Sequence, residues 1–126
     1  MNIIEKLKEL GITLPKPAAP LAAYVPVVIS GGFAYVSGQL PVSEGKVTCT
    51  GTFGINVDID KGQKAAELCA INILAAMNMA LDGDLSKIER LVKITGFCAS
   101  THEFTDHPKV INGASEFESI TKQPRL

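Results

Sequence analysis

The longest regular pattern of apolar residues lies between Lys61 and Leu81, and it predicts the main helix of the chain. Apolar side chains recur there every three or four residues, so they share one wide face of a helix. These positions are Ala65, Leu68, Cys69, Ile71, Leu74, Ala75 and Met79. The turn Asp82-Gly83-Asp84 ends the pattern. Because so wide an apolar face has to be covered, we expect this helix to lie against a sheet.

Shorter helical patterns stand near the two ends of the chain. From Asn2 to Leu10 an apolar stripe predicts a helix that Asn2 caps and Gly11 ends. The prolines at 15, 17 and 20 then predict an extended connector. A last helix is expected to begin at Lys109 and to continue through Phe117.

Strand patterns occupy the region between the first helix and the main helix. β-Branched residues between Tyr24 and Ile29 predict one strand, and Phe33 to Ser37 predicts a second. Ser30-Gly31-Gly32 is typical of the turn between them, so the two strands should form a hairpin. Beyond a further turn, Val47 to Thr52 predicts another short strand.

The elements after the main helix complete an α+β pattern. Leu85 to Arg90 predicts a short helical turn, and Leu91 to Ala99 predicts a strand with Val92, Ile94 and Phe97 inward. We expect mostly antiparallel strands, with helices on one face of the sheet, in a single domain over residues 1–126. About four short strands cover so apolar a helix thinly. Either an oligomer completes the burial, or the chain is shorter than its relatives.

Composition and charge argue against some classes of partner. Apolar residues make up 46% of the chain and charged residues 20%, which is ordinary for a globular domain. The net charge of -1 gives no strongly basic surface for nucleic acid or a membrane. No segment has the length and apolarity of a membrane span or a signal peptide, so we expect a cytoplasmic protein.

The spacing of the three cysteines limits their chemistry. Cys49, Cys69 and Cys98 form neither a CxxC pair nor a metal-binding pattern with histidine. His102 follows Cys98 closely enough to suggest a base beside a nucleophilic thiol. We favour the structural interpretation, in which all three are free thiols in a reducing compartment.

A polar segment at the end of the second expected strand is the best candidate for a site. Phe33 and Tyr35 share one face of that strand, because side chains alternate along it. The strand delivers Ser37 to its end, and Gly38, which has no Cβ, lets the backbone come close to a ligand. The alternative is an ordinary hairpin turn, in which Ser-Gly dipeptides are common.

Together with its surroundings, this segment resembles one family. Residues 33–41 match a strand followed by a Ser-Gly-Gln-hydrophobic-Pro signature, and Tyr24 matches a tyrosine before the hairpin. Asn72-Ile73-Leu74 matches the centre of a long helix, and Val110-Ile111-Asn112 matches a helical Val-x-Asn pattern. The chain thus resembles the reactive intermediate deaminase family, also called YjgF-like or L-PSP endoribonuclease-like.

The resemblance implies a fold, an assembly and an activity. The fold would be chorismate-mutase-like α+β, a mixed sheet covered on one face by helices. The assembly would be a homotrimer with clefts between subunits, which fits the thinly covered helix. Family members of known activity hydrolyse enamines and imines such as 2-aminoacrylate to 2-keto acids and ammonia. They need no metal or organic cofactor, so the implied partner is a small carboxylate substrate.

The resemblance also implies roles for individual residues. Arg125 would grip the substrate carboxylate through two hydrogen bonds, unless it is only a charge near the chain end. Asn112 would orient a substrate carbonyl, or else cap a local turn. Tyr24 would line the cleft, or be a half-buried tyrosine at a strand start. Ser37 and Gly38 would form the cleft wall and supply a backbone donor.

Other polar and aromatic candidates are interpreted as structural. His102 and His107 lie in a polar loop, so we expect both to be solvated. Phe33, Tyr35 and Phe97 are expected in the core or at an interface.

The sequence therefore favours a deaminase of reactive enamines and imines that uses a carboxylate anchor and a bound water. The family's last two strands, with the acidic residue that often holds this water, have no counterpart in these 126 residues. Their absence favours an alternative, a trimer that binds a small acidic metabolite without turnover. A ribonuclease or translation inhibitor is the further alternative. The near-neutral charge and the lack of a histidine pair or a Lys/Arg-rich face argue against it.

Overall fold

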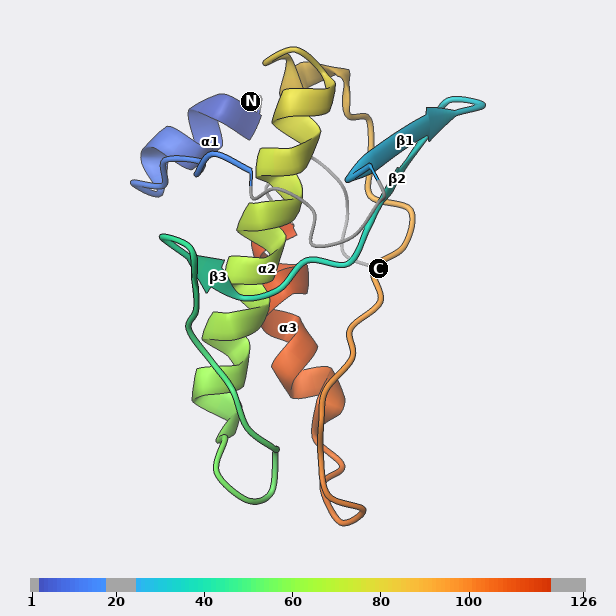
Figure 1. Ribbon diagram of the computed structural model, residues 1–126. Coiled ribbons are helices and arrows are strands. Elements are labelled where there is room, and N and C mark those ends of the chain that lie inside the picture. Colours follow the sequence, from blue (N-terminus) through green and yellow to red (C-terminus); the bar gives the residue numbers. More distant parts are fainter. Residues whose placement is uncertain (1–2, 18–24, 119–126) are drawn as a thin grey trace.

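The computed structural model describes residues 3–17 and 25–118, with side chains as far as residue 115. One long helix, α2, runs through the middle of the molecule, and α3 lies behind it (Figure 1). A β-hairpin projects on one side and α1 lies on the other. In chain order the elements are α1 (Ile3–Glu9), β1 (Val27–Ser30), β2 (Phe33–Val36), β3 (Val42–Ser43), β4 (Lys46–Val47), α2 (Ile59–Ala80), the 3-10 turn η1 (Leu85–Lys87) and α3 (His107–Glu118).

The main helix α2 confirms the prediction from the apolar period. Asp58 caps its N-terminus, where its side chain accepts a hydrogen bond from the Lys61 N–H at 2.8 Å. Asp82 and Gly83 follow its C-terminus with left-handed φ angles of 52° and 86°, which turn the chain away. Two details differ from expectation. Met79 is 55% exposed, and the helix packs chiefly against α3 rather than against a sheet.

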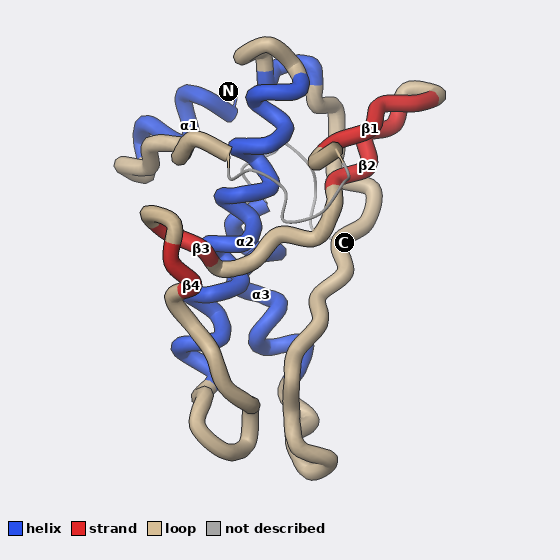
Figure 2. The backbone as a smooth tube through the Cα atoms, viewed as in Figure 1, coloured by secondary structure: helices blue, strands red, loops and turns tan. Residues whose placement is uncertain are grey.

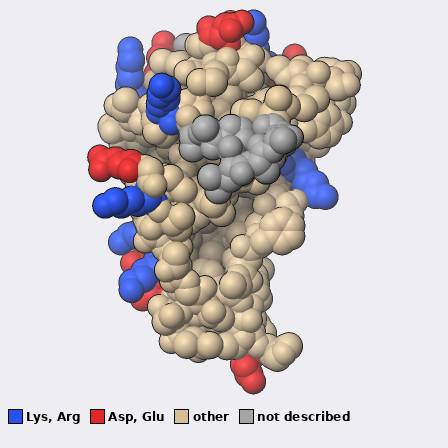
Figure 3. All heavy atoms as spheres, in the orientation of Figure 1, with Lys and Arg blue, Asp and Glu red and all other residues tan. Residues whose placement is uncertain are grey.

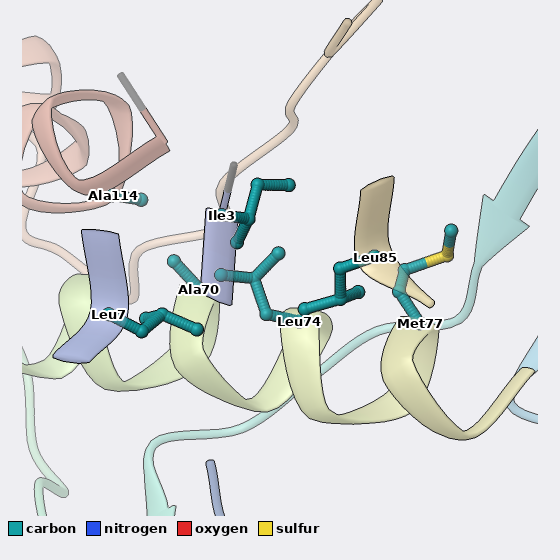
Figure 4. Close-up of a cluster of buried hydrophobic side chains, with 7 residues drawn as sticks. All are labelled: Ile3, Leu7, Ala70, Leu74, Met77, Leu85 and Ala114. Carbon is teal, nitrogen blue, oxygen red and sulfur yellow. The ribbon is translucent and has the colours of Figure 1, made fainter. Parts of the chain in front are cut away.

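The main core gathers side chains from all three helices around the C-terminal half of α2. Ile3 and Leu7 of α1, the stripe predicted from sequence, lie over Ala70 and Leu74 of α2 (Figure 4). Leu85 of η1 closes the same cluster and is fully buried. Met77 and Ala114 are its other buried members. Burying a leucine-sized side chain stabilises a fold by about 1.5–3 kcal/mol, so this cluster holds the three helices together.

A smaller core lies where α2 and α3 begin. Phe53 and Val57, in the loop before α2, are buried against Val110 of α3. The packing is close there because Gly62 and Gly113 carry no Cβ. A Cβ on Gly62 would lie 2.5 Å from the Phe53 ring, and one on Gly113 would lie 2.1 Å from the backbone oxygen of Gln63. Glycine at 113 therefore permits the two helices to cross closely, and glycine at 62 leaves room for the Phe53 ring beside α2.

The predicted hairpin is confirmed. β1 and β2 pair antiparallel, with Val27 opposite Val36 and Ser30 opposite Phe33. Gly31 and Gly32 have φ angles of 60° and 81°, which suit the tight turn that right-handed strand twist favours. Of the two places expected for Phe33, the core or an interface, the core is wrong, since Phe33 is 52% exposed.

A second hairpin replaces the strand expected over Val47 to Thr52. β3 and β4 pair antiparallel around Glu44 and Gly45, whose φ angles are 52° and 78°. Val47 belongs to β4, but no strand continues from there to Thr52. The strand prediction is therefore wrong beyond Val47.

The expected single mixed sheet is wrong for the part of the chain that the structure describes. The strands form two separate two-stranded sheets, and residues 91–99 run as an extended coil (Figure 2). A strand needs a neighbour for its backbone hydrogen bonds. Among the described residues this segment meets one only at its end, where the Ala99 carbonyl accepts from the Phe53 N–H at 2.9 Å and Ser100 bridges to Phe53. Val92 and Phe97 are 58% and 95% exposed, contrary to expectation, whereas Ile94 packs on the main core as expected.

The architecture is α+β all the same, with antiparallel strands and three α-helices among the described residues. None of the helices in these ranges combines the length and apolarity that crossing a membrane demands.

Candidate functional site

The candidate site is the short segment that leaves β2, which we call the Ser37–Gln39 bridge. At its first residue, the Ser37 N–H donates to the Pro26 carbonyl at 2.9 Å and so extends the β1–β2 ladder. The Ser37 carbonyl in turn accepts a hydrogen bond from the Gln39 side-chain amide at 3.3 Å. The start of the bridge is therefore fixed to the hairpin.

A tight turn around Pro41 fixes the other end of the bridge. The Val42 N–H donates to the Leu40 carbonyl at 2.8 Å, which closes a three-residue turn that suits the fixed φ of proline. Thr48 donates to the Pro41 carbonyl from its backbone N–H at 2.8 Å and from its Oγ1 hydroxyl at 2.9 Å. The bridge thus spans two anchored ends, which is a rigid way to present short polar groups.

The bridge carries a hydroxyl without a hydrogen-bond partner and a glycine with open space around it, among the residues that the structure describes. The Ser37 hydroxyl oxygen is buried and has no hydrogen-bond partner among the described residues. An unpaired buried hydroxyl costs about 1–3 kcal/mol, so it is normally explained by water, an ion or a ligand. Gly38 is exposed, and a Cβ built there would meet nothing within 4 Å. Its φ angle lies outside the left-handed region, so neither local packing nor backbone geometry demands glycine.

An exposed apolar surface stands beside the bridge, on the hairpin. Tyr35 is 62% exposed and Val28, its partner across the strands, is 50% exposed. Phe33 shares this face because side chains alternate along β2. These aromatics are not core residues, so the core interpretation is wrong for them, and the interface interpretation stays a prediction.

The other sequence-predicted site residues are not joined to the bridge. Asn112 lies inside α3 and is exposed, whereas Val110 and Ala114 on the opposite side of that helix are buried. It therefore does not cap a turn, and no hydrogen bond in the described structure links it to the bridge. Tyr24 and Arg125 lie outside the described residues, and their roles stay predictions.

A serine–histidine pair that the sequence analysis missed lies at the start of α3. The Ser100 hydroxyl and His107 Nε2 are 2.9 Å apart and half-buried. The His107 ring packs edge-on against Phe104 at 5.1 Å, and Phe104 stacks on Phe53 at 5.0 Å. The expectation that His107 is solvated is therefore wrong. Pro108 was the sequence signal for this position. Proline is common in the first turn of a helix, so it places His107 at the start of α3.

The cysteines bear out the structural interpretation. All three are free thiols. Burial raises the pKa of the Cys98 thiol, and burial together with the nearby Cys49 raises the pKa of Cys69 to about 11. The Cys69 and Cys98 thiols are therefore protonated at neutral pH and are poor nucleophiles. His102 is exposed, and no hydrogen bond joins it to Cys98 in the described structure. The described residues also contain no cluster of acidic, histidine and cysteine side chains able to hold a metal ion.

Comparison with known proteins gives one consistent result. Residues 5–121 match the family model described as "YjgF/chorismate mutase-like, putative endoribonuclease". Protein TCP17 of Trypanosoma cruzi is 41% identical over 115 residues, covering 91% of this chain and 71% of that protein. The chain also matches crystal structures of two bacterial proteins.

The first of these is Atu1372 from Agrobacterium tumefaciens, described as of unknown function. It has a TM-score of 0.86 and 50% identity, covering 98% of this chain and 74% of that one. The second, described as a putative endoribonuclease from Shewanella oneidensis, has a TM-score of 0.88 and 31% identity, covering 93% and 77%. The helices and small antiparallel sheets described above are thus the family's chorismate-mutase-like fold, and the chain belongs to the YjgF/chorismate mutase-like family.

Proposed function

We propose that this protein hydrolyses reactive enamines and imines of the 2-aminoacrylate kind to 2-keto acids and ammonia. The reaction asks little of a site, because an imine carbon is already electrophilic. The site has to orient the substrate carboxylate, hold a water molecule and move protons. None of these tasks calls for a metal or an organic cofactor.

The observation that carries the proposal is the unpaired Ser37 hydroxyl beside the open space at Gly38. A hydroxyl can both donate and accept, so it can hold the substrate nitrogen or the attacking water. The missing Cβ of Gly38 leaves its backbone open to a flat, small substrate. Both groups sit on a segment anchored at its two ends, which satisfies the demand for pre-organisation.

Further parts of the proposed site come from the sequence and from neighbouring subunits. Arg125 grips the carboxylate, Asn112 orients a substrate carbonyl, and Tyr24 lines the cleft. The cleft lies between subunits of a cytoplasmic homotrimer. The exposed apolar hairpin face that includes Tyr35 supports such an assembly, because apolar patches of this kind mark interaction surfaces.

The test is ammonia release from freshly generated 2-aminoacrylate, with the mass of the protein in solution measured on the same sample. Ser37→Ala should lower turnover by about tenfold or more, the rate equivalent of ~1.4 kcal/mol, without lowering stability. Ser43→Ala, at an exposed position in β3, is the matched control and should retain the wild-type rate. A trimer without turnover would contradict the proposal and indicate a metabolite-binding protein instead.

An endoribonuclease is the second candidate, favoured by the descriptions of the family and of the Shewanella protein. The net charge of -1 argues against it, because RNA binding draws most of its affinity from phosphate contacts. On the face in Figure 3, Lys and Arg side chains lie around the rim, several of them next to Asp and Glu. Cleavage of single-stranded RNA by the preparation, with no ammonia release, would reverse our preference.

A further inference from the structure

One side chain of α2 reaches across to the turn that anchors the bridge. The Asn72 Nδ2 atom donates hydrogen bonds to the Leu40 carbonyl and to the Val42 carbonyl, both at 3.0 Å. Asn72 thus connects the central helix to the chain on either side of Pro41. We call this pair of hydrogen bonds the Asn72 clamp.

The clamp fits the chemistry of both partners. A side-chain amide nitrogen carries two hydrogens, and each serves one carbonyl. Residues 40 and 42 flank the turn around Pro41, and the carbonyls of both face the Asn72 side chain. Pro41 has no N–H of its own to offer there. With the clamp in place, the Leu40 carbonyl accepts from both Asn72 and the Val42 N–H.

Few other side chains could take the place of this asparagine. Leucine has a similar size but no donor, so two carbonyls would lose their partner. Aspartate would bring a negative carboxylate against two carbonyl oxygens, which repel it. Serine has a single O–H and could serve only one carbonyl.

The clamp lies at one end of the bridge and so affects the site. The bridge follows the Ser37–Pro26 hydrogen bond and precedes the turn around Pro41. Because the clamp binds that turn to α2, it sets the position of the turn relative to the helix. We propose that Asn72 is a positioning residue, which holds Ser37 and Gly38 where they meet the substrate without touching it. This inference rests on the deaminase function proposed above.

The experiment compares Asn72→Leu with Asn78→Leu. Asn78 is a matched control on the same helix, because its Oδ1 is buried without a partner and the described structure shows no hydrogen bond from it. Ammonia release from 2-aminoacrylate should show kcat about tenfold lower in Asn72→Leu, with KM changed much less. Asn78→Leu should keep both constants.

Amide hydrogen exchange supplies a second readout that does not depend on turnover. The Val42 and Thr48 amides, which donate within the turn, should exchange faster in Asn72→Leu, while amides in the middle of α2 keep their rates. A general loss of stability would instead speed exchange throughout. If Asn72→Leu does not fold, Asn72→Ser, with one remaining donor, replaces it.

The outcomes separate the two proposals. If the wild type releases ammonia and Asn72→Leu keeps the same kcat, the positioning role is overturned and the deaminase function stands. If the wild type releases no ammonia, the deaminase function fails, and only the hydrogen-exchange result then tests the clamp. Unchanged exchange at Val42 and Thr48 then overturns the clamp, and local acceleration there supports it.

Discussion

The contact between α2 and α3 at Gly113 offers the most direct test of the fold. Gly113 of α3 packs against the backbone of α2 at Gln63. In Gly113→Ala the new Cβ would lie 2.1 Å from the Gln63 carbonyl oxygen and 2.8 Å from its Cα. Because backbone atoms cannot rotate away as a side chain can, the helices themselves must separate.

The size of the effect follows from this geometry. Reaching a separation of 3.0 Å requires a shift of about 0.9 Å at the crossing. Overpacking a well-packed interior costs typically about 1–3 kcal/mol, and the rigid backbone here favours the upper end. Alanine regains about 1 kcal/mol over glycine in helix propensity. The net loss should be about 2 kcal/mol, or roughly 10 °C in Tm for a domain of this size.

Thermal and urea unfolding, followed by circular dichroism, measure this loss. Ser115→Ala is the control, since it introduces the same residue at an exposed position of the same helix and should change stability by less than about 0.5 kcal/mol. Equal stability of the two variants would refute the close crossing of α2 and α3.

Two further predictions concern the site and the thiols. Gly38→Ala should leave stability unchanged or raise it by about 0.4–1 kcal/mol, because the new Cβ meets open space. The same variant should lose turnover about tenfold, and a parallel loss of stability would contradict our account of Gly38. Alkylation of Cys69 by iodoacetamide requires the thiolate, and its thiol pKa is raised to about 11. The rate should therefore be slow at pH 7.5 and still be rising above about pH 10, as checked by mass spectrometry of the labelled peptide, whereas a half-maximal rate near about pH 8.5–9 would show an unperturbed thiol.

Helices were predictable because their signal is local and repeats. The apolar period gave α2 nearly its full length, and the stripe of Ile3 and Leu7 gave α1. The Gly31-Gly32 turn located the first hairpin for a similar reason, since few other dipeptides adopt both left-handed φ angles. Each of these features depends on residues within a few positions of one another.

The strand predictions failed where a distant partner was needed. Residues 91–99 have strand-like composition, but composition cannot supply the neighbour whose backbone groups complete a ladder. The segment is held instead by single contacts, such as the packing of Ile94 on the main core and the isolated β-bridge between Ser100 and Phe53.

For the candidate site as well, the sequence showed the local features but not the contacts between distant residues. The sequence pointed to Ser37 and Gly38, because a strand end followed by glycine is visible in a few letters. It did not reveal that the Ser37 hydroxyl is buried without a partner, or that Asn72 reaches back to the turn beyond the bridge. Nor did it show that Asn112 faces away from α2.

By itself, then, the sequence determined the helices, the first hairpin, the family and the segment where chemistry is expected, since all of these rest on local patterns. The tertiary structure decided which strands found partners, how closely α2 and α3 cross, and what anchors the Ser37–Gln39 bridge. The physical reason is that hydrogen bonds and packing contacts between residues dozens of positions apart depend on how the whole chain is arranged. Asn72 and Leu40, separated by 32 positions, meet only once α2 lies against that turn.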